Sequence, residues 1–263
     1  MRFLFDFISP YSYVAWTRVH ALAARHGRTV EPVPVLFAAL LDHHGHKGPA
    51  EIHAKREHMA KQLLRITARE GIPFAPPPAH PFNPVAALRV ACLDHAAQRR
   101  IIDVLFDAVW AGGPGVADER SVVSVLDAAG FPGEELVADA KRLSGGLRTH
   151  TQQAIELGVF GVPTILVDGE LFWGFDSFPD IDAFLSGRDR VDPALLARWR
   201  TLPVAAVRGG SRRAASPFRL RDSSALDPLL AALVAAGATV LQRDRASATV
   251  RDPDGNEITL SFE

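Results

Sequence analysis

The stretch FDFISPYSY, residues 5–13, decides the fold of this chain. An apolar segment, residues 2–8, is typical of a first β-strand, and a Ser-Pro pair breaks it. Apolar and aromatic residues then recur at helical spacing over residues 11–26. The sequence therefore predicts a strand, a tight turn and a helix whose start carries Ser9 and Ser12.

Ser9 and Ser12 have the spacing of a redox Cys-x-x-Cys motif but contain no sulfur. Unpaired N–H groups and the positive end of the helix dipole stabilise an anion at such a turn, and in redox enzymes they lower the pKa of a cysteine there. A serine hydroxyl has no base in this motif, but it can donate a hydrogen bond to a thiolate from another molecule. The other interpretation is that Ser9 only caps the helix. The motif by itself favours neither.

Periodicity and Gly/Pro breaks predict the order of the remaining elements. A second strand is expected over residues 29–36, followed by a His-rich loop over 42–49. Two strands, 164–167 and 170–173, are joined by Asp168-Gly169, a pair typical of a hairpin turn with positive φ at both positions. Helices are expected over residues 52–70, 85–98, 99–111, 119–129, 134–143, 147–157 and 178–185.

This order, β-α-β, a group of helices, then α-β-β-α, describes an α/β fold with a thioredoxin-like core. The core would comprise residues 1–38 and 146–187, interrupted by an all-helical insertion over 39–145. A linker over 188–217 would lead to a small C-terminal α/β appendage over 218–263.

Composition excludes several classes of partner. The 263 residues carry a net charge of −1, so no net field gathers nucleic acid or an anionic membrane, and no segment reaches the ~18 apolar residues that span a bilayer. The single cysteine, Cys92, excludes an internal disulfide and is interpreted as a small buried hydrophobe. Trp16 and Trp110 are predicted to lie in the core. A reducing, cytoplasmic location, where glutathione is plentiful, is expected.

Two further segments suggest a binding site. If the Val162–Pro163 bond in GVPT, residues 161–164, is cis, the backbone N–H and C=O of Val162 point outward and can pair with an extended peptide. In FWGFDS, residues 172–177, backbone N–H groups and Asp176 could hold a carboxylate and an ammonium respectively. Each segment is a weak signal alone, but the three in this order around a helical insertion are quite specific.

With these segments, the chain resembles the 2-hydroxychromene-2-carboxylate isomerase family, a relative of kappa-class glutathione transferases and DsbA-like oxidoreductases. The resemblance spans about residues 1–187 and includes KGPAEI (47–52), KR (55–56) and PFNP (81–84). It implies a glutathione-dependent enzyme that isomerises an unsaturated aromatic keto acid from cis to trans. The implied chemistry is reversible addition and elimination of the glutathione thiolate.

The resemblance also implies residue roles. Ser9 matches the serine that orients and activates the glutathione sulfur, and Val162 matches the residue whose backbone pairs with the cysteinyl unit. The turn that binds the γ-glutamyl unit corresponds to Trp173, Gly174, Phe175 and Asp176. The substrate side corresponds to His46, Lys47 and Asn83.

Three positions depart from the family, which often has Asn at His46, an aromatic residue near His58 and Arg at Ser177. These departures leave the substrate open. Two other functions also stay open: a kappa-like glutathione transferase or peroxidase that consumes glutathione, and a non-catalytic binding protein with a thioredoxin fold. A homodimer is expected.

Three histidines within residues 43–46 could ligate a metal, but a solvated loop is the better interpretation and no metal site is expected.

The C-terminal appendage resembles half of a vicinal-oxygen-chelate (glyoxalase-like) module. The likeness rests on the hairpin sequence at residues 248–261 and a helix over 226–236. Such modules commonly carry a metal-binding glutamate where this chain has Thr259, although Glu257 is two positions away. Because a full metal site normally needs paired modules, we interpret the appendage as a docking or dimerising element rather than a second active site.

Overall fold

The computed structural model describes residues 1–203, 218–219, 226–235, 238–243, 247–251 and 257–261. These residues divide into two compact units, 1–191 and 192–263. Most of the expected linker, residues 204–217, and the expected hairpin turn at 252–256 lie outside the described residues. Within the described ranges, no helix combines the length and apolar character that crossing a bilayer requires.

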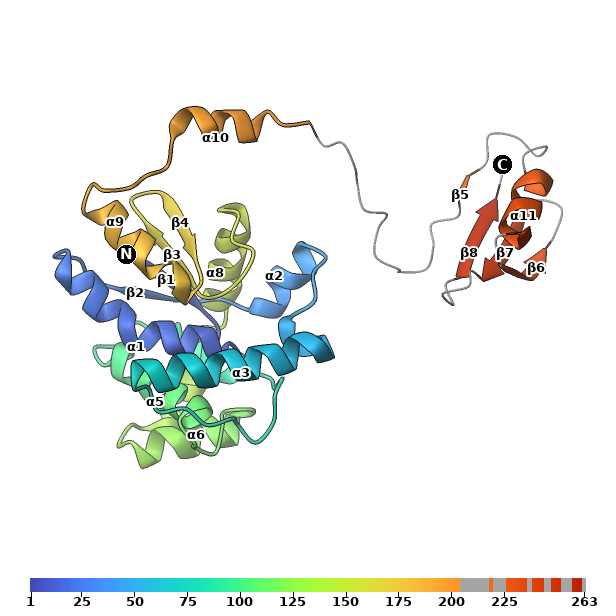
Figure 1. Cartoon of the computed structure of the whole chain (residues 1–263). Helices are drawn as coiled ribbons and strands as arrows, with labels where there is room; N and C mark the ends of the chain where they lie inside the picture. The colour runs from blue at the N-terminus through green and yellow to red at the C-terminus, as the bar shows by residue number, and fades with distance from the viewer. Residues whose placement is uncertain (204–217, 220–225, 236–237, 244–246, 252–256, 262–263) are drawn as a thin grey trace. The chain divides into compact units, whose positions relative to one another are not determined.

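A four-stranded sheet in the order β2-β1-β3-β4 forms the centre of the first unit (Figure 1). β1 (Arg2–Phe5) pairs in parallel with β2 (Glu31–Pro34) and antiparallel with β3 (Thr164–Val167). β3 pairs antiparallel with β4 (Glu170–Trp173), and the turn between them has positive φ at both residues, as predicted. Strands from the two ends of this unit therefore share one sheet, which agrees with a thioredoxin-like fold.

Helices surround this sheet and fill the long stretch between β2 and β3 (Figure 1). α1 begins after the cap residue Ser9, and two short 3-10 segments, η1 (Pro49–Glu51) and η2 (Phe175–Ser177), lie in the connections. The helices are α1 (Pro10–Arg25), α2 (Phe37–His43), α3 (His53–Glu70), α4 (Val85–Ala91), α5 (Gln98–Trp110), α6 (Glu119–Ala128), α7 (Gly133–Arg142), α8 (Gly145–Glu156) and α9 (Phe178–Leu185).

The two faces of the sheet pack on different helices, because successive strand side chains point to opposite faces. Phe5 on one face packs with Trp16 of α1 and Phe106 of α5, at centroid distances of 5.8 and 5.4 Å. Leu4 on the other face belongs to a cluster with Leu40 of α2 and with residues of α8. The first face and the inserted helices share one continuous core.

Two element boundaries differ substantially from the sequence-based expectation, and one helix is additional. β1 ends at Phe5 rather than residue 8, because the chain turns and the N–H of Ser9 donates to the carbonyl of Asp6 (3.1 Å). The helix expected over 85–98 ends at residue 91, so α4 and α5 are separated by a connection. α2 was not expected at all. It has no side-chain cap at its own N-cap residue and depends on distant residues for that role.

The second unit begins with α10 (Pro193–Arg200), which starts at the cap residue Asp192. Its sheet has the order β5-β8-β7-β6, and Leu226 and Leu230 of α11, the helix that follows β5, pack with Ala248 and Val250. These elements are β5 (Phe218–Arg219), α11 (Leu226–Ala235), β6 (Thr239–Arg243), β7 (Ser247–Arg251) and β8 (Glu257–Ser261). The β-α-β-β-β order matches the expectation, and the glyoxalase likeness stays a prediction.

Candidate active site

Ser9 lies at the junction of β1 and α1 and is 6% exposed. Its Oγ accepts a hydrogen bond from the N–H of Ser12 (3.1 Å), so Ser9 does cap the helix. The same Oγ lies 3.4 Å from the carbonyl oxygen of Val162, which is longer than the usual 2.5–3.0 Å of an O–H···O bond. Capping uses a lone pair of Oγ and donation uses its proton. The two interpretations of Ser9 are therefore compatible, and the weakly engaged proton is available to a better acceptor.

Two side chains of the helical insertion hold the turn before Ser9. The indole N–H of Trp110, at the end of α5, donates to the carbonyl of Phe7 (2.8 Å). Nε2 of His80 lies 2.9 Å from the carbonyl oxygen of Ile8. A carbonyl only accepts, so Nε2 carries the proton. The helical insertion therefore fixes the backbone that presents Ser9.

The side chain of Asp6 also holds this turn. Its carboxylate accepts the N–H of Ile8 on Oδ1 (3.0 Å) and the N–H of Phe37 on Oδ2 (2.9 Å). Asp6 is 1% exposed, and burial raises its pKa to about 7 despite these two hydrogen bonds. Burial also lowers the pKa of His80, so this imidazole is neutral at neutral pH. Arg56 of α3 acts in the same direction on His80.

The loop before β3 faces Ser9. The Val162–Pro163 peptide bond is cis, as predicted. The carbonyl of Val162 is turned toward the Ser9 hydroxyl, whereas its N–H has no hydrogen-bond partner among the described residues. This N–H is a free backbone donor on the loop that faces Ser9. It could pair with an extended peptide.

Trp173 and Gly174 join this loop to the last helix. The Trp173 indole is 53% exposed and lies 5.2 Å from the Phe160 ring, centroid to centroid. A Cβ at Gly161 would come within 2.7 Å of the indole Nε1, so only glycine allows this packing. The N–H of Gly174 donates to the carbonyl of Pro163 (2.9 Å), which ties the two segments together.

Asp176, in η2, is exposed and forms no ion pair with any described cation. Its charge contributes, after burial, to raising the pKa of Tyr11, which places the carboxylate near the start of α1. The Tyr11 hydroxyl donates to Oε1 of Gln62 on α3 (2.5 Å). Ser9, Val162 and the segment from Trp173 to Asp176, in which Phe175 is partly buried, therefore lie near one another.

The residues that are expected to bind the substrate are exposed. His46 and Lys47 are exposed and follow α2, where the N–H of His46 donates to the carbonyl of Leu41 (2.8 Å). His44 is the histidine that is held in place, with Nε2 3.1 Å from the carbonyl of Val159. Within the part of the chain that the structure describes, no three His, Cys, Asp or Glu side chains are grouped to hold a metal ion.

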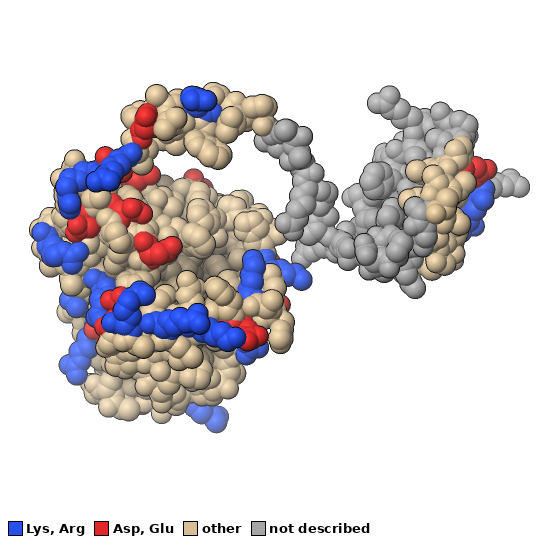
Figure 2. Space-filling view, viewed as in Figure 1, with Lys and Arg blue, Asp and Glu red and all other residues tan. Residues whose placement is uncertain are grey.

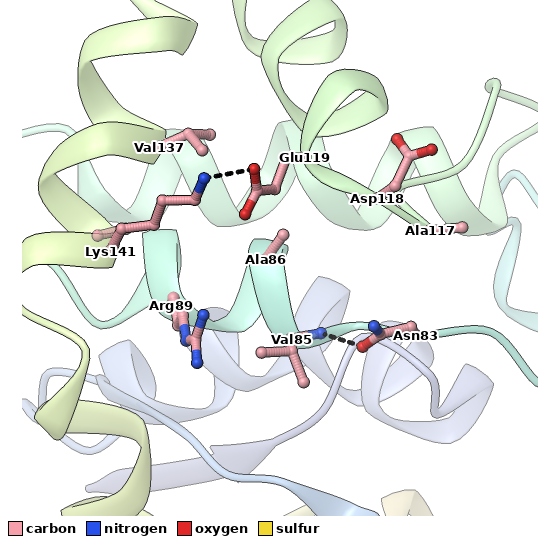
Figure 3. Close-up of a pocket in the computed structure, with 10 residues that line it drawn as sticks. Asn83, Val85, Ala86, Arg89, Ala117, Asp118, Glu119, Val137 and Lys141 are labelled. Carbon is pink, nitrogen blue, oxygen red and sulfur yellow. Dashed lines mark hydrogen bonds and ion pairs between the residues drawn. The ribbon is translucent and has the colours of Figure 1, made fainter.

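Asn83 lies in a cavity of about 220 Å³ between α4, α6 and α7 (Figure 3). Its Oδ1 accepts the N–H of Val85 (3.1 Å). Arg89 also lines this cavity, as do Glu119 and Lys141, which form an ion pair (2.6 Å). The lining does not include Ser9 or its neighbours, so the structure does not bring Asn83 into the same pocket as the other expected residues.

α3 gives the molecule a basic surface beside this site. Figure 2 shows basic side chains in a row across the face where α3 lies. The basic residues of this helix, all exposed, are Lys55, Arg56, Lys61, Arg65 and Arg69. Only two of them, Lys61 and Arg69, pair with an acid in the described structure. Gln62 of the same helix contacts Tyr11, so this basic surface adjoins the start of α1.

Sequence reasoning gave no role to Asp6 and His80 and interpreted Trp110 only as core. Trp110 is indeed buried, and its indole N–H has the additional role described above. Asp6 stands inside the decisive stretch and His80 directly precedes PFNP, but neither position has a local signal for its distant partner. Cys92 behaves as expected: it is partly buried, and burial raises its pKa to about 12, which makes it a poor nucleophile.

Comparison with known proteins places this architecture in a family. The DSBA-like thioredoxin domain family matches residues 1–186. The 2-hydroxychromene-2-carboxylate isomerase of Pseudomonas putida is 30% identical over 181 residues, which cover 66% of this chain and 88% of that protein. Glutathione S-transferase kappa 1 of Caenorhabditis elegans is 25% identical over 194 residues, 67% of this chain and 86% of that protein.

The fold agrees with a solved relative. The structure of a selenomethionine 2-hydroxychromene-2-carboxylate isomerase superposes with a TM-score of 0.61 at 24% identity, covering 76% of this chain and 96% of that one. The match to the Pseudomonas putida enzyme supports the expectation of an isomerase. The chain belongs to the DSBA-like thioredoxin domain family and, within it, to the family of the 2-hydroxychromene-2-carboxylate isomerases.

Proposed function

We propose that the chain is a glutathione-dependent cis–trans isomerase of an unsaturated aromatic keto acid of the 2-hydroxychromene-2-carboxylate type. The observation that carries the proposal is the Ser9 hydroxyl, whose proton has only a weak acceptor at 3.4 Å. Two further groups fit glutathione: the free N–H of Val162 suits its cysteinyl unit, and Asp176, without a cation, suits its ammonium. The turn of Trp173, Gly174 and Phe175 would bind the rest of the γ-glutamyl unit, with donors other than the N–H of Gly174, which the carbonyl of Pro163 accepts.

When bound, glutathione supplies a thiolate that adds to a conjugated double bond and leaves again after rotation about the resulting single bond. The Ser9 hydroxyl donates to the sulfur and holds it at the start of α1, where the helix dipole favours the anion. Asp6, His80 and Trp110 keep the backbone of the turn fixed, so the donor is already oriented before the substrate arrives.

His46 and Lys47 would bind the substrate, with Lys47 pairing with its carboxylate. Neither side chain has an ion-pair partner among the described residues. Lys47→Ala should raise the KM for the substrate roughly tenfold and leave the Kd for glutathione unchanged. Lys61→Ala is the matched control, because Lys61 is exposed and already paired with Glu57 (2.6 Å). Equal effects of the two variants on KM would show that Lys47 does not bind the substrate. Asn83 is the weakest of the proposed substrate residues, since it lines a different cavity.

The direct test combines binding and turnover. Glutathione is titrated into the full chain by calorimetry, and conversion of 2-hydroxychromene-2-carboxylate is followed with and without glutathione while free thiol is counted. We expect saturable binding, conversion only with glutathione, and complete recovery of the thiol. Conversion without glutathione would contradict the proposed chemistry.

A second candidate is a glutathione transferase, supported by the similarity to a kappa-class enzyme. It predicts loss of free thiol in proportion to product, which the same thiol count detects. A binding protein without activity would bind glutathione and convert nothing.

We also propose that the chemistry and the assembly of the protein are carried by different parts of the chain. Residues 1–38 and 146–187 with the insertion 39–145 would carry the chemistry, while residues 218–263, beyond the linker 188–217, would serve assembly, most simply of a homodimer. A chain that ends at Leu202 should bind glutathione with unchanged Kd but have a smaller mass by light scattering. Loss of binding by a folded truncated chain would make the appendage part of the site.

A further inference from the structure

One carboxylate connects the Ser9 turn to the segment that carries the proposed substrate residues. Oδ1 of Asp6 accepts the N–H of Ile8 (3.0 Å), directly before Ser9. Oδ2 accepts the N–H of Phe37 (2.9 Å), the first residue of α2. The two contacts are 29 residues apart in sequence, and Asp6 is 1% exposed, so water does not compete for either hydrogen bond.

α2 and the segment after it form one hydrogen-bonded unit. After α2 the chain folds back on it, since the N–H of Gly45 donates to the carbonyl of Asp42 (3.2 Å) and that of His46 to the carbonyl of Leu41 (2.8 Å). The side chain of His44 fixes this unit to the carbonyl of Val159 (3.1 Å), in the loop that leads to Val162. The start of α2 therefore helps to set where His46 and the following lysine lie.

The sequence of α2 itself does little to define where the helix starts. The residue at its N-cap position, Leu36, has no side chain that can cap the helix. Two distant side chains accept the first N–H groups instead: Asp6 accepts that of Phe37, and Oγ1 of Thr151 in α8 accepts that of Leu36 (3.0 Å). Among the described residues, Thr151 has no hydrogen bond to the Ser9 turn, and Asp6 is the side chain that joins the two regions in this way.

We propose that Asp6 is a positioning residue that couples the glutathione side of the site to the substrate side by holding the Ser9 turn and the start of α2 on one carboxylate. The inference rests on the proposed function, which assigns glutathione to one side and the substrate to the other. The coupling itself depends on two hydrogen bonds and can be tested without substrate.

The coupling should weaken on acidification. Hydrogen bonds to an ionised carboxylate are stronger than those to a protonated one, and burial raises the pKa of Asp6 to about 7. No charged side chain contributes to this shift. The titratable and charged groups on the elements joined to Asp6 include His80, which contacts the carbonyl of Ile8, Arg56, which acts on His80, and His44 after α2. Burial lowers the pKa of His80, whereas it raises that of Asp6.

The first test is hydrogen exchange measured at one pH on wild type, Asp6→Asn and Thr151→Val. Asparagine keeps the shape but presents an N–H₂ to one of the two donors. We expect Asp6→Asn to speed exchange roughly tenfold in peptides covering both 6–12 and 36–47, because both regions lose a hydrogen bond. Thr151→Val should affect 36–47 only. Normal exchange over 36–47 in a folded Asp6→Asn variant would overturn the coupling.

The second test is the affinity for S-methylglutathione, which has no thiol proton, between pH 6.5 and 8.5. Wild type should bind about fivefold more weakly at the acidic end. Asp6→Asn should be about tenfold weaker than wild type at pH 8.5 and nearly independent of pH. Thr151→Val should follow wild type. A wild-type affinity and pH profile in Asp6→Asn would refute the role of Asp6.

These results separate the inference from the proposed function. If no form of the protein binds the ligand at any pH, the glutathione proposal fails and the exchange data still decide whether Asp6 couples the two regions. If Asp6→Asn does not fold, exchange of the wild type at pH 6.5 and 8.5, corrected for the intrinsic rate, replaces it. Coupling then requires the regions 6–12 and 36–47 to lose protection together on acidification.

Discussion

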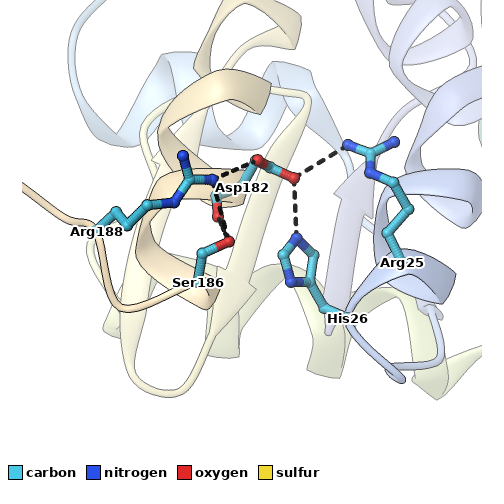
Figure 4. Close-up of polar contacts among 5 residues, drawn as sticks. All are labelled: Arg25, His26, Asp182, Ser186 and Arg188. Atoms are coloured by element: carbon cyan, nitrogen blue, oxygen red, sulfur yellow. Dashed lines mark hydrogen bonds and ion pairs between the residues drawn. The ribbon is translucent and has the colours of Figure 1, made fainter.

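The two ends of α1 are held in opposite ways. At the N-terminal end, buried or partly buried groups hold the turn that presents Ser9: the Asp6 carboxylate, the Trp110 indole N–H and the His80 imidazole. At the C-terminal end the groups are more exposed: the exposed Arg25 and Arg188 and the partly buried His26 meet around Asp182 of α9 (Figure 4). Its carboxylate pairs with Arg25 (3.2 Å) and His26 (2.9 Å) of the α1 end, and with Arg188 (3.2 Å).

The difference lies in the surroundings of the polar groups. A buried carbonyl that loses its donor costs about 1–3 kcal/mol, because water cannot replace the donor. An exposed ion pair is worth about 0–1 kcal/mol, since water and salt screen it. The buried end can therefore fix a donor in place for chemistry, whereas the exposed end only tethers two helices. Changes at the two ends should differ accordingly in their effect on turnover.

The largest effect is expected at Ser9. Ser9→Ala removes the proposed donor to the sulfur and should lower kcat roughly 10²–10³-fold. It also removes the helix cap, at a cost of about 1 kcal/mol in the free energy of unfolding. Turnover and urea denaturation should be measured on one preparation.

Ser9→Asp separates the two roles of Ser9. Aspartate caps helices as well as serine does, but at neutral pH it has no proton to donate and places a negative charge beside the sulfur. We expect a capped, folded and inactive protein. Substantial turnover by Ser9→Asp would show that Ser9 acts only as a helix cap.

A smaller effect is expected from Trp110→Phe. Phenylalanine keeps most of the packing but leaves the carbonyl of Phe7 without a donor, so the free energy of unfolding should fall by about 1–3 kcal/mol and turnover several-fold. Trp16→Phe is the matched control, because its indole N–H donates to Asp103 (2.6 Å), away from the Ser9 turn. It should lose stability without losing turnover. Equal losses of turnover would mean that general loosening, not the turn, limits the reaction.

The sequence predicts elements where the signal is local. The 164–167 and 170–173 strands and the Asp168-Gly169 turn have the predicted bounds and φ signs, because periodicity and turn chemistry are properties of neighbouring residues. α2 could not be predicted, since its first N–H groups are accepted by side chains far away in sequence.

The same limit applies to the site. Ser9 and Val162 could be named from short motifs, and the structure brings them within 3.4 Å. The contact of His80 with the Ser9 turn spans 72 residues and depends on how the insertion packs, which no local pattern encodes. The family resemblance pointed to Asn83, but not to the separate cavity that this residue lines.

Ser12→Ala tests whether every polar group at the buried end matters. The Ser12 hydroxyl is fully buried and has no hydrogen-bond partner in the described structure. Removing a buried, unpaired hydroxyl costs no hydrogen bond, so the free energy of unfolding should stay the same or rise by about 1 kcal/mol. Glutathione affinity should not change. A clear loss of affinity in calorimetry would mean that Ser12 also contacts the ligand.

The smallest effect is expected at the exposed end, from Asp182→Asn. Hydrogen bonds from His26 and Arg25 lower the pKa of Asp182, so its contribution to stability is present above the ordinary aspartate value and is lost as the pH falls through the lowered one. Asp182→Asn should therefore melt slightly below wild type at pH 7 and together with it once the pH lies below the lowered pKa of Asp182, in differential scanning calorimetry. Turnover and glutathione affinity at pH 7 should be those of wild type, because Asp182 tethers the end of α1 that is remote from Ser9. A loss of turnover comparable to that of Trp110→Phe would show that the exposed end also positions the site, and the contrast between the two ends of α1 would not hold.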